Sequence, residues 1–183
     1  HNAINALAAI AVATYYQVPG EDIAAAFRQP VEIPGRMRQF QLGGRIIIDD
    51  TYNANPESMK AALSYLQAQP GARKKIAVLG DMFELGRLSG RAHVEILQWA
   101  QSQELDSIFV TGEAMQQAVK SMRGRKNNVV YRGDKQALAR ELARITRAGD
   151  FILVKGSRGM KMEEIIRHLQ EQLSTQYGEE ANH

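Results

Sequence analysis

The chain of 183 residues contains no cysteine, and this absence excludes disulfide bridges and thiolate metal sites. A strong excess of one charge is also lacking: 23 lysines and arginines face 20 aspartates and glutamates, and the net charge of +3 is too small to predict nucleic-acid binding. No apolar run approaches the length of a membrane span and the mean hydropathy is −0.34, so we expect no membrane contact and a cytoplasmic protein. The hydrophobic share of 44% still suffices for one domain with its own core plus a small attachment.

Motifs for self-contained catalysis are missing as well. There is no Gly-rich phosphate loop ending in Gly-Lys-Thr or Gly-Lys-Ser, no Ser-His-Asp set, no paired general acid and base, and no His-x-x-x-His zinc pair. We therefore predict no catalytic residue and no metal site within this chain. Because the chain starts at His1, without an initiator methionine or a signal peptide, we expect a fragment of a larger protein.

What the sequence does contain is a regular alternation of short apolar runs and helical patterns. The predicted strands cover residues 46–48, 75–79, 107–110, 128–131 and 151–154, and the predicted helices cover 57–67, 90–102, 114–122, 135–147 and 162–174. This alternation predicts an α/β fold, a Rossmann-like and mostly parallel sheet with helices on both faces. Residues 39–42 are expected to add an antiparallel strand through a Gly43-Gly44 hairpin, and residues 175–183 are expected to form a frayed tail.

A short helical part precedes the sheet. Residues 2–16 are rich in alanine and have an apolar face, and residues 21–28 give a second helical pattern. Pro30, Pro34 and Gly35 then interrupt the chain, so we place a domain boundary here, with residues 1–33 before it and residues 34–183 after it.

The most informative segment runs from Asp49 to Met59, where two acids, two asparagines and Pro56 directly follow an apolar strand. Right-handed crossovers would bring the strand ends Asp50, Gly80, Gly112 and Lys155 to one edge of the sheet. Open α/β sheets bind ligands at this edge, so the sequence predicts a binding site there.

Four segments carry a resemblance to a known family. They read Asp-Asp-Thr-Tyr-Asn-Ala-Asn-Pro-Glu-Ser-Met from Asp49, His-Asn-Ala-Ile-Asn-Ala from His1, Leu-Gly-Asp-Met-Phe-Glu-Leu-Gly from Leu79, and Val-Lys-Gly-Ser-Arg from Val154. Taken together they resemble the Mur ligase family. The resemblance covers nearly all of this chain but only the last part of the family's three-domain architecture.

The resemblance implies a ligase that uses ATP and Mg²⁺ to join D-alanyl-D-alanine to a UDP-muramoyl tripeptide through an acyl phosphate, and that acts as a monomer. Residues 1–33 would be the last helices of the central ATP-binding domain, which makes most contacts with ATP and Mg²⁺, and residues 34–183 would be the C-terminal ligase domain. Two alternatives stay open: another ligase of this kind, such as a folylpolyglutamate or cyanophycin synthetase relative, and a non-catalytic nucleotide-binding or interaction module. The Tyr-Asn-Ala-Asn-Pro and Lys-Gly-Ser-Arg motifs argue against the other ligases.

Four residues are candidates for the nucleotide. The resemblance places Asn2 against the adenine with Asn5 in support, and it makes Arg36 a γ-phosphate or interdomain arginine, with Arg38 as a nearby competitor. Asp50 suits the ribose, because a carboxylate can accept two hydrogen bonds from a diol. Asp49 is its alternative, since strand alternation directs only one of the two acids inward.

A second group of candidates concerns the other substrates. Tyr52, Asn53 and Asn55 would line the space between nucleotide and dipeptide, although asparagine is also common in turns without any function. Where the strand ending at Val154 meets the next helix, Lys155, Ser157 and Arg158 would hold a carboxylate, Arg158 in a bidentate fork and Lys155 as a point charge. The resemblance implies that this carboxylate is the D-alanyl-D-alanine end.

Three further residues stay undecided between binding and structure. Asp81 and Glu84, at a second strand end, would either recognise the dipeptide's ammonium group or stabilise loop backbone, and the structural role is favoured slightly. His93 is expected to be an ordinary helix residue.

Overall fold

The computed structural model describes residues 2–28, 33–122 and 128–180, with side chains over 4–28, 33–122 and 128–175. The chain divides into two compact units, His1–Glu32 and Ile33–His183. The first unit is a pair of helices, α1 (Asn2–Tyr15) and α2 (Gly20–Arg28), which match the two predicted helices to within one residue.

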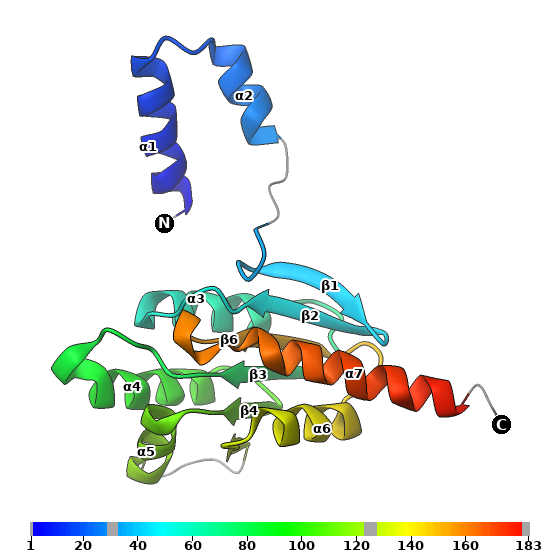
Figure 1. Ribbon diagram of the computed structural model, residues 1–183. Helices are drawn as coiled ribbons and strands as arrows, with labels where there is room; N and C mark the ends of the chain where they lie inside the picture. The colour runs from blue at the N-terminus through cyan, green and yellow to red at the C-terminus, as the bar shows by residue number, and fades with distance from the viewer. Residues whose placement is uncertain (1, 29–32, 123–127, 181–183) are drawn as a thin grey trace. The chain divides into compact units, whose positions relative to one another are not determined.

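The described residues of the second unit form one sheet, whose strands lie in the order β1, β2, β6, β3, β4, β5 (Figure 1). The strands are β1 (Arg38–Leu42), β2 (Arg45–Asp50), β3 (Lys75–Leu79), β4 (Ser107–Val110), β5 (Val129–Tyr131) and β6 (Phe151–Lys155). Strand β1 runs antiparallel to β2, and all other neighbouring strands are parallel. The predicted α/β fold with its mostly parallel sheet is confirmed, and so is the hairpin through Gly43 and Gly44.

Helices cover both faces of this sheet (Figure 1). The helices α3 (Pro56–Gln67), α4 (Ser89–Ser102) and α5 (Glu113–Ser121) share one core with the sheet, whereas α6 (Lys135–Ile145) and α7 (Glu163–Glu180) share the other. Strand alternation divides β2 between the two cores, since Ile48 joins the first and Ile47 the second. Each isoleucine is fully buried, and burial of such a side chain contributes roughly 1.5–3 kcal/mol.

The last helix is longer than the sequence pattern predicted. Helix α7 continues to Glu180, so the prediction of a frayed tail was wrong over residues 175–180, and residues 181–183 lie outside the described part of the chain. The polar residues after Leu173 do not break a helix, and the Thr175 hydroxyl donates a hydrogen bond back to the Glu171 carbonyl at 3.0 Å. The helix therefore continues beyond Leu173, although the apolar pattern of the sequence ends there.

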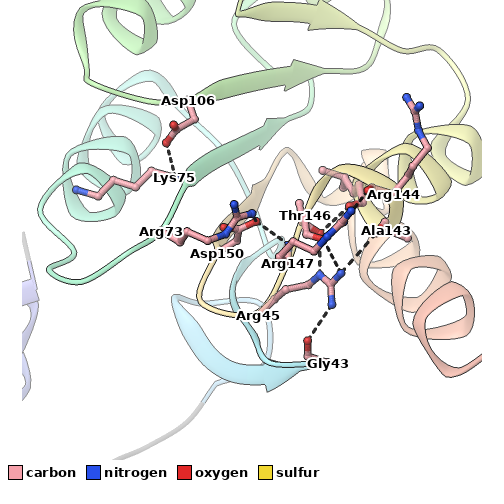
Figure 2. Close-up of polar contacts among 11 residues, drawn as sticks. Gly43, Arg45, Arg73, Lys75, Asp106, Ala143, Arg144, Thr146, Arg147 and Asp150 are labelled. Atoms are coloured by element: carbon pink, nitrogen blue, oxygen red, sulfur yellow. Dashed lines mark hydrogen bonds and ion pairs between the residues drawn. The ribbon is translucent and has the colours of Figure 1, made fainter. Parts of the chain in front are cut away.

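Helix α6 is shorter than predicted and ends at Ile145, where Arg45 binds its last carbonyl groups (Figure 2). The Arg45 side chain donates from Nε to Thr146 Oγ1 and from Nη2 to the Thr146 carbonyl, both at 2.7 Å, and from Nη1 to the Gly43 carbonyl at 2.8 Å. Arg45 is only 4% exposed, so its charge is balanced by carbonyl dipoles at a helix C-terminus. This contact joins the start of β2 to the end of α6.

A second polar contact holds the same end of the sheet together. Asp150 is fully buried, and its Oδ2 accepts hydrogen bonds from Arg73 Nη2 at 2.6 Å and from the Arg147 backbone N–H at 2.8 Å (Figure 2). The strands β3 and β6 therefore start from a fixed geometry, and their carboxyl ends are fixed at the opposite edge.

None of the described helices combines the length and the hydropathy that a bilayer crossing requires.

Candidate functional site

The site is built at the carboxyl ends of the central strands, where Asp50 closes β2 and Lys155 closes β6. These two residues are register partners on neighbouring parallel strands, and Lys155 Nζ lies 2.6 Å from Asp50 Oδ2. Lys155 also donates to the Asn53 carbonyl at 2.9 Å, while Asp50 Oδ1 accepts from the Met37 N–H at 3.1 Å. The structure thus brings together two predicted site residues as an ion pair.

This pair is almost inaccessible to solvent. The side chains of Lys155 and Asp50 are 2% and 13% exposed. A buried lysine needs its carboxylate partner, because an isolated charge in the interior is costly. Asp49 is half-buried, and its Oδ1 accepts from the backbone and hydroxyl of Thr51 at 3.2 and 2.6 Å. Of the two acids, Asp50 therefore faces the Lys155 side of the strand end.

Arg36 and Tyr52 meet above this strand end. The guanidinium carbon of Arg36 lies 4.1 Å from the centroid of the Tyr52 ring, a cation–π contact, and both side chains are exposed. The Tyr52 N–H donates to the Gly35 carbonyl at 2.8 Å. Gly35 has φ +74°, and a Cβ there would lie 2.9 Å from Tyr52 N, so only glycine allows this close approach. Arg36, predicted as a γ-phosphate or interdomain arginine, thus contacts Tyr52, which was predicted to line the space between nucleotide and dipeptide.

The asparagines of the same loop have local hydrogen bonds. Asn55 is the N-cap of α3: its side chain accepts from the Ser58 N–H at 2.8 Å, and the Ser58 hydroxyl accepts from the Asn55 N–H at 3.0 Å. This is a capping box, followed by Pro56 at the first helical position. Asn53 Oδ1 accepts from the Ala54 N–H at 2.8 Å. The side-chain oxygens of both asparagines shape the loop.

Ser157 links three loops at the sheet edge. Its hydroxyl accepts from the Phe83 N–H at 2.7 Å and donates to the Ala54 carbonyl at 3.4 Å, and its own N–H donates to the Asp81 carbonyl at 2.9 Å. Arg158 begins the short 3₁₀ turn Arg158–Met160 and is 67% exposed at its side chain, with Glu163 Oε1 at 3.6 Å. Ser157 is thus held inside the fold, whereas Arg158 faces solvent.

A pocket of about 360 Å³ opens between the β3–α4 loop and the start of α5. Its lining residues are Asp81, Met82, Phe83, Glu84, Leu85, Gly86, Ser89, Glu113, Ala114 and Gln117. The Asp81 carboxylate accepts from the N–H groups of Ala114 and Met115, at 3.1 and 2.8 Å, and so caps α5 from another loop. Glu84, one of these lining residues, is exposed and has φ +63°.

The two remaining candidates lie in the first unit. Asn2 opens α1, but its side chain and all of His1 lie outside the described part of the chain. Asn5 lies on α1 with an exposed side chain.

Sequence reasoning missed the role of His93 and the pocket residues on α5. His93 is fully buried and bonded through both ring nitrogens, although we expected an ordinary helix residue. A signal was present: His93 falls on the apolar face of its helix, between Ala92 and Ile96, and four residues after Ser89. Glu113 and Gln117 carry no comparable signal, because their place at the pocket follows from the packing of α5.

The fold and the site define a class: a Rossmann-like α/β domain whose polar side chains converge at the carboxyl ends of its parallel strands. The family model described as "Mur ligase, glutamate ligase domain" matches residues 35–158, and the chain therefore belongs to the Mur ligase family. It is similar to the UDP-N-acetylmuramoyl-tripeptide--D-alanyl-D-alanine ligase of Bacillus subtilis, with 37% identity over 175 residues, which cover 92% of this chain and 38% of the relative.

Solved structures agree with this assignment. MurF from Acinetobacter baumannii matches with a TM-score of 0.81 at 31% identity, covering 91% of this chain and 37% of that one. The MurF ligase of Thermotoga maritima in complex with ADP matches with a TM-score of 0.71 at 28% identity, covering 81% of this chain and 33% of that one. The chain thus spans little more than a third of the length of the relatives that it matches.

Proposed function

We propose that this chain is the C-terminal portion of an ATP-dependent ligase that joins D-alanyl-D-alanine to UDP-N-acetylmuramoyl-tripeptide in the cytoplasm. The observation that carries the proposal is the 37% identity, over 92% of this chain, to a relative named for this reaction. Residues 1–33 are assigned to the end of a central ATP-binding domain, and residues 34–183 to the ligase domain that closes over ATP. The working form is proposed to be a monomer.

The nucleotide side of the site is assigned to the strand end of β2 and the loop before β1. Arg36 is exposed and rests on the Tyr52 ring, which holds its guanidinium without neutralising it, so it remains available to a phosphate group. Asp50 stays the ribose candidate, because each carboxylate oxygen has a second lone pair beyond the bonds to Lys155 and Met37. Asn2 and Asn5 are proposed for the adenine.

The dipeptide is assigned to the pocket beside the β3–α4 loop and to Arg158. D-alanyl-D-alanine is a zwitterion, so its site needs a cation for the carboxylate and an acceptor for the ammonium group. Arg158 has only a 3.6 Å contact with Glu163 and can offer a bidentate fork to a carboxylate. Glu84 and Glu113 line the pocket and can accept hydrogen bonds from the ammonium group.

In the reaction, the tripeptide carboxylate takes the γ-phosphoryl group of ATP and ADP leaves. The dipeptide amine, after losing a proton to water, attacks the resulting acyl carbon and expels phosphate. This chain contributes binding and orientation, which can supply much of the acceleration of a bimolecular step. Mg²⁺ neutralises phosphate charge in such transfers. Within the described residues no group of three or more His, Cys, Asp and Glu side chains could hold a metal ion, so the proposal assigns no Mg²⁺ ligand to this chain.

The test uses the longer protein that contains this chain, with the upstream reading frame that should encode a Gly-Lys-Thr phosphate loop. One reaction contains ATP, Mg²⁺, UDP-muramoyl tripeptide and D-alanyl-D-alanine. Parallel reactions contain ATP and Mg²⁺ with a folate and glutamate, or with a cyanophycin primer and aspartate or arginine. Of the amines tested, only D-alanyl-D-alanine is expected to give phosphate release and a new amide product. Product with glutamate on a folate, or with aspartate or arginine on a cyanophycin primer, would indicate another ligase, and an upstream frame without the phosphate loop would indicate a non-catalytic module.

A further inference from the structure

The wall of the pocket is held by three consecutive backbone groups that follow β3. The Asp81 carbonyl accepts from the Ser157 N–H at 2.9 Å, the Met82 N–H donates to His93 Nε2 at 2.9 Å, and the Phe83 N–H donates to Ser157 Oγ at 2.7 Å. Directly after them the chain turns through Glu84, a non-glycine residue at φ +63°. A strained turn of this kind persists only where the surrounding contacts hold it.

Of the two residues that bind this backbone, Ser157 and His93, only His93 lies on a helix. Its ring is fully buried within the face of α4 that packs on the sheet, and it reaches both ends of the pocket loop. At one end Nε2 accepts from Met82, and at the other end Nδ1 lies 2.7 Å from the Ser89 carbonyl. Because a carbonyl can only accept and a backbone N–H can only donate, Nδ1 must carry the proton and Nε2 must be bare.

An apolar side chain would fill this place in the core equally well but would leave the Met82 N–H without an acceptor. Met82 is 1% exposed, so its N–H has no access to bulk water, and an unpaired buried donor is costly. The imidazole thus fastens Met82 at the start of the loop to Ser89 after it, and both residues line the pocket.

We propose that His93 is a positioning residue for the second substrate: its neutral Nδ1–H tautomer fixes the loop from Met82 to Ser89 so that Glu84 presents its carboxylate at the pocket. The substrate part of this inference rests on the proposed function. His93 itself does not touch the substrate, and its effect passes through the Met82 backbone.

The test compares two conservative variants in the longer protein that contains this chain. His93→Gln places an amide oxygen near the position of Nε2 and keeps an acceptor for Met82. His93→Asn places an amide nitrogen near the position of Nδ1 and keeps a donor for Ser89, but offers Met82 nothing. The two variants therefore separate the contact that holds the loop from the mere filling of the core.

We expect His93→Asn to raise the apparent KM for D-alanyl-D-alanine about tenfold or more, because an unpaired buried donor weakens the equilibrium that holds the loop by about a factor of ten or more. In His93→Gln the same KM should stay within about threefold of the wild type. The apparent KM for ATP should change less than about twofold in both variants. Equal effects of the two variants, or parallel rises for both substrates, would overturn the positioning role.

Two measurements do not depend on ligase activity and so separate a failure of this inference from a failure of the proposed function. Hydrogen exchange at the Met82 amide should be accelerated about tenfold or more by His93→Asn and little by His93→Gln. Nitrogen NMR of the wild-type imidazole, which needs no variant, should find the proton on Nδ1. A proton on Nε2, or unchanged exchange at Met82 in His93→Asn, contradicts the inference even if the protein is an active ligase.

Discussion

At the residue scale, the pair of Asp50 and Lys155 shows how a predicted site residue also serves the fold. The two charges lie 2.6 Å apart with little solvent around them. Removal of one partner from a buried pair typically costs about 3–5 kcal/mol, whereas replacement of both by uncharged groups is often tolerated. The pair should therefore respond very differently to single and double substitution.

Lys155→Met is expected to lower the free energy of unfolding by about 3–5 kcal/mol, because it leaves the Asp50 carboxylate buried without its cation. The double variant Asp50→Asn with Lys155→Met should recover most of that loss. Chemical denaturation of the three proteins measures the difference, with Lys120→Met on the exposed side of α5 as a control that should stay within about 0.5 kcal/mol. A single variant as stable as the wild type would show that the pair contributes nothing.

Arg158 is the opposite case, since the fold uses it little. In the longer protein, Arg158→Ala should raise the apparent KM for D-alanyl-D-alanine by tens to thousands of fold, because a desolvated charge pair is worth about 2–5 kcal/mol, and Arg158→Lys should rescue little because the fork geometry is lost. The apparent KM for ATP should barely move. Steady-state kinetics with each substrate varied in turn measures both.

A matched control for this experiment is Arg91→Ala, which removes another exposed arginine with a glutamate partner, Glu95, at 2.6 Å. It should leave both KM values unchanged. If Arg158→Ala changed the KM for ATP and not the KM for the dipeptide, the loop after β6 would belong to the nucleotide site.

At the scale of helices and strands, the sequence pattern predicted what depends on local periodicity and missed what depends on distant partners. The apolar runs gave all five parallel strands, and Pro56 correctly indicated the start of α3. The end of α6 could not be predicted, because it depends on Arg45, about a hundred residues earlier in the chain. The burial of His93 could have been inferred from its place on the apolar face of α4, but its hydrogen bond to the Met82 N–H could not, because that bond depends on how the loop before the helix folds.

The contact between Arg45 and the end of α6 provides a test at this scale. Arg45→Met keeps much of the side-chain volume but leaves the carbonyls of Gly43 and Thr146 without their donor, so we expect a loss of about 1–3 kcal/mol in unfolding free energy. Arg144→Met is the control, because its side chain is exposed and points away from the cluster (Figure 2), and it should change stability by less than about 0.5 kcal/mol. Equal thermal denaturation midpoints for the two variants would contradict the proposed contribution of Arg45.

At the scale of the whole molecule, we propose that the chain supplies one side of a site whose other side belongs to a longer protein. It covers 38% of the Bacillus subtilis relative and contains no phosphate loop. Its sheet nevertheless has a complete core on both faces.

We expect the purified chain of 183 residues to fold but to release no phosphate when ATP, Mg²⁺ and both other substrates are supplied. Thermal unfolding followed by circular dichroism should be cooperative, because most of the chain belongs to the unit with the two-sided core. ATP should bind with a Kd on the order of millimolar or weaker, since a few hydrogen bonds from Arg36 and Asp50 barely exceed the cost of ordering ligand and loop. Calorimetry measures this affinity directly. Micromolar binding would mean that the chain holds a complete nucleotide site, and turnover at the rate of the longer protein would refute the assignment of catalysis to the segment upstream.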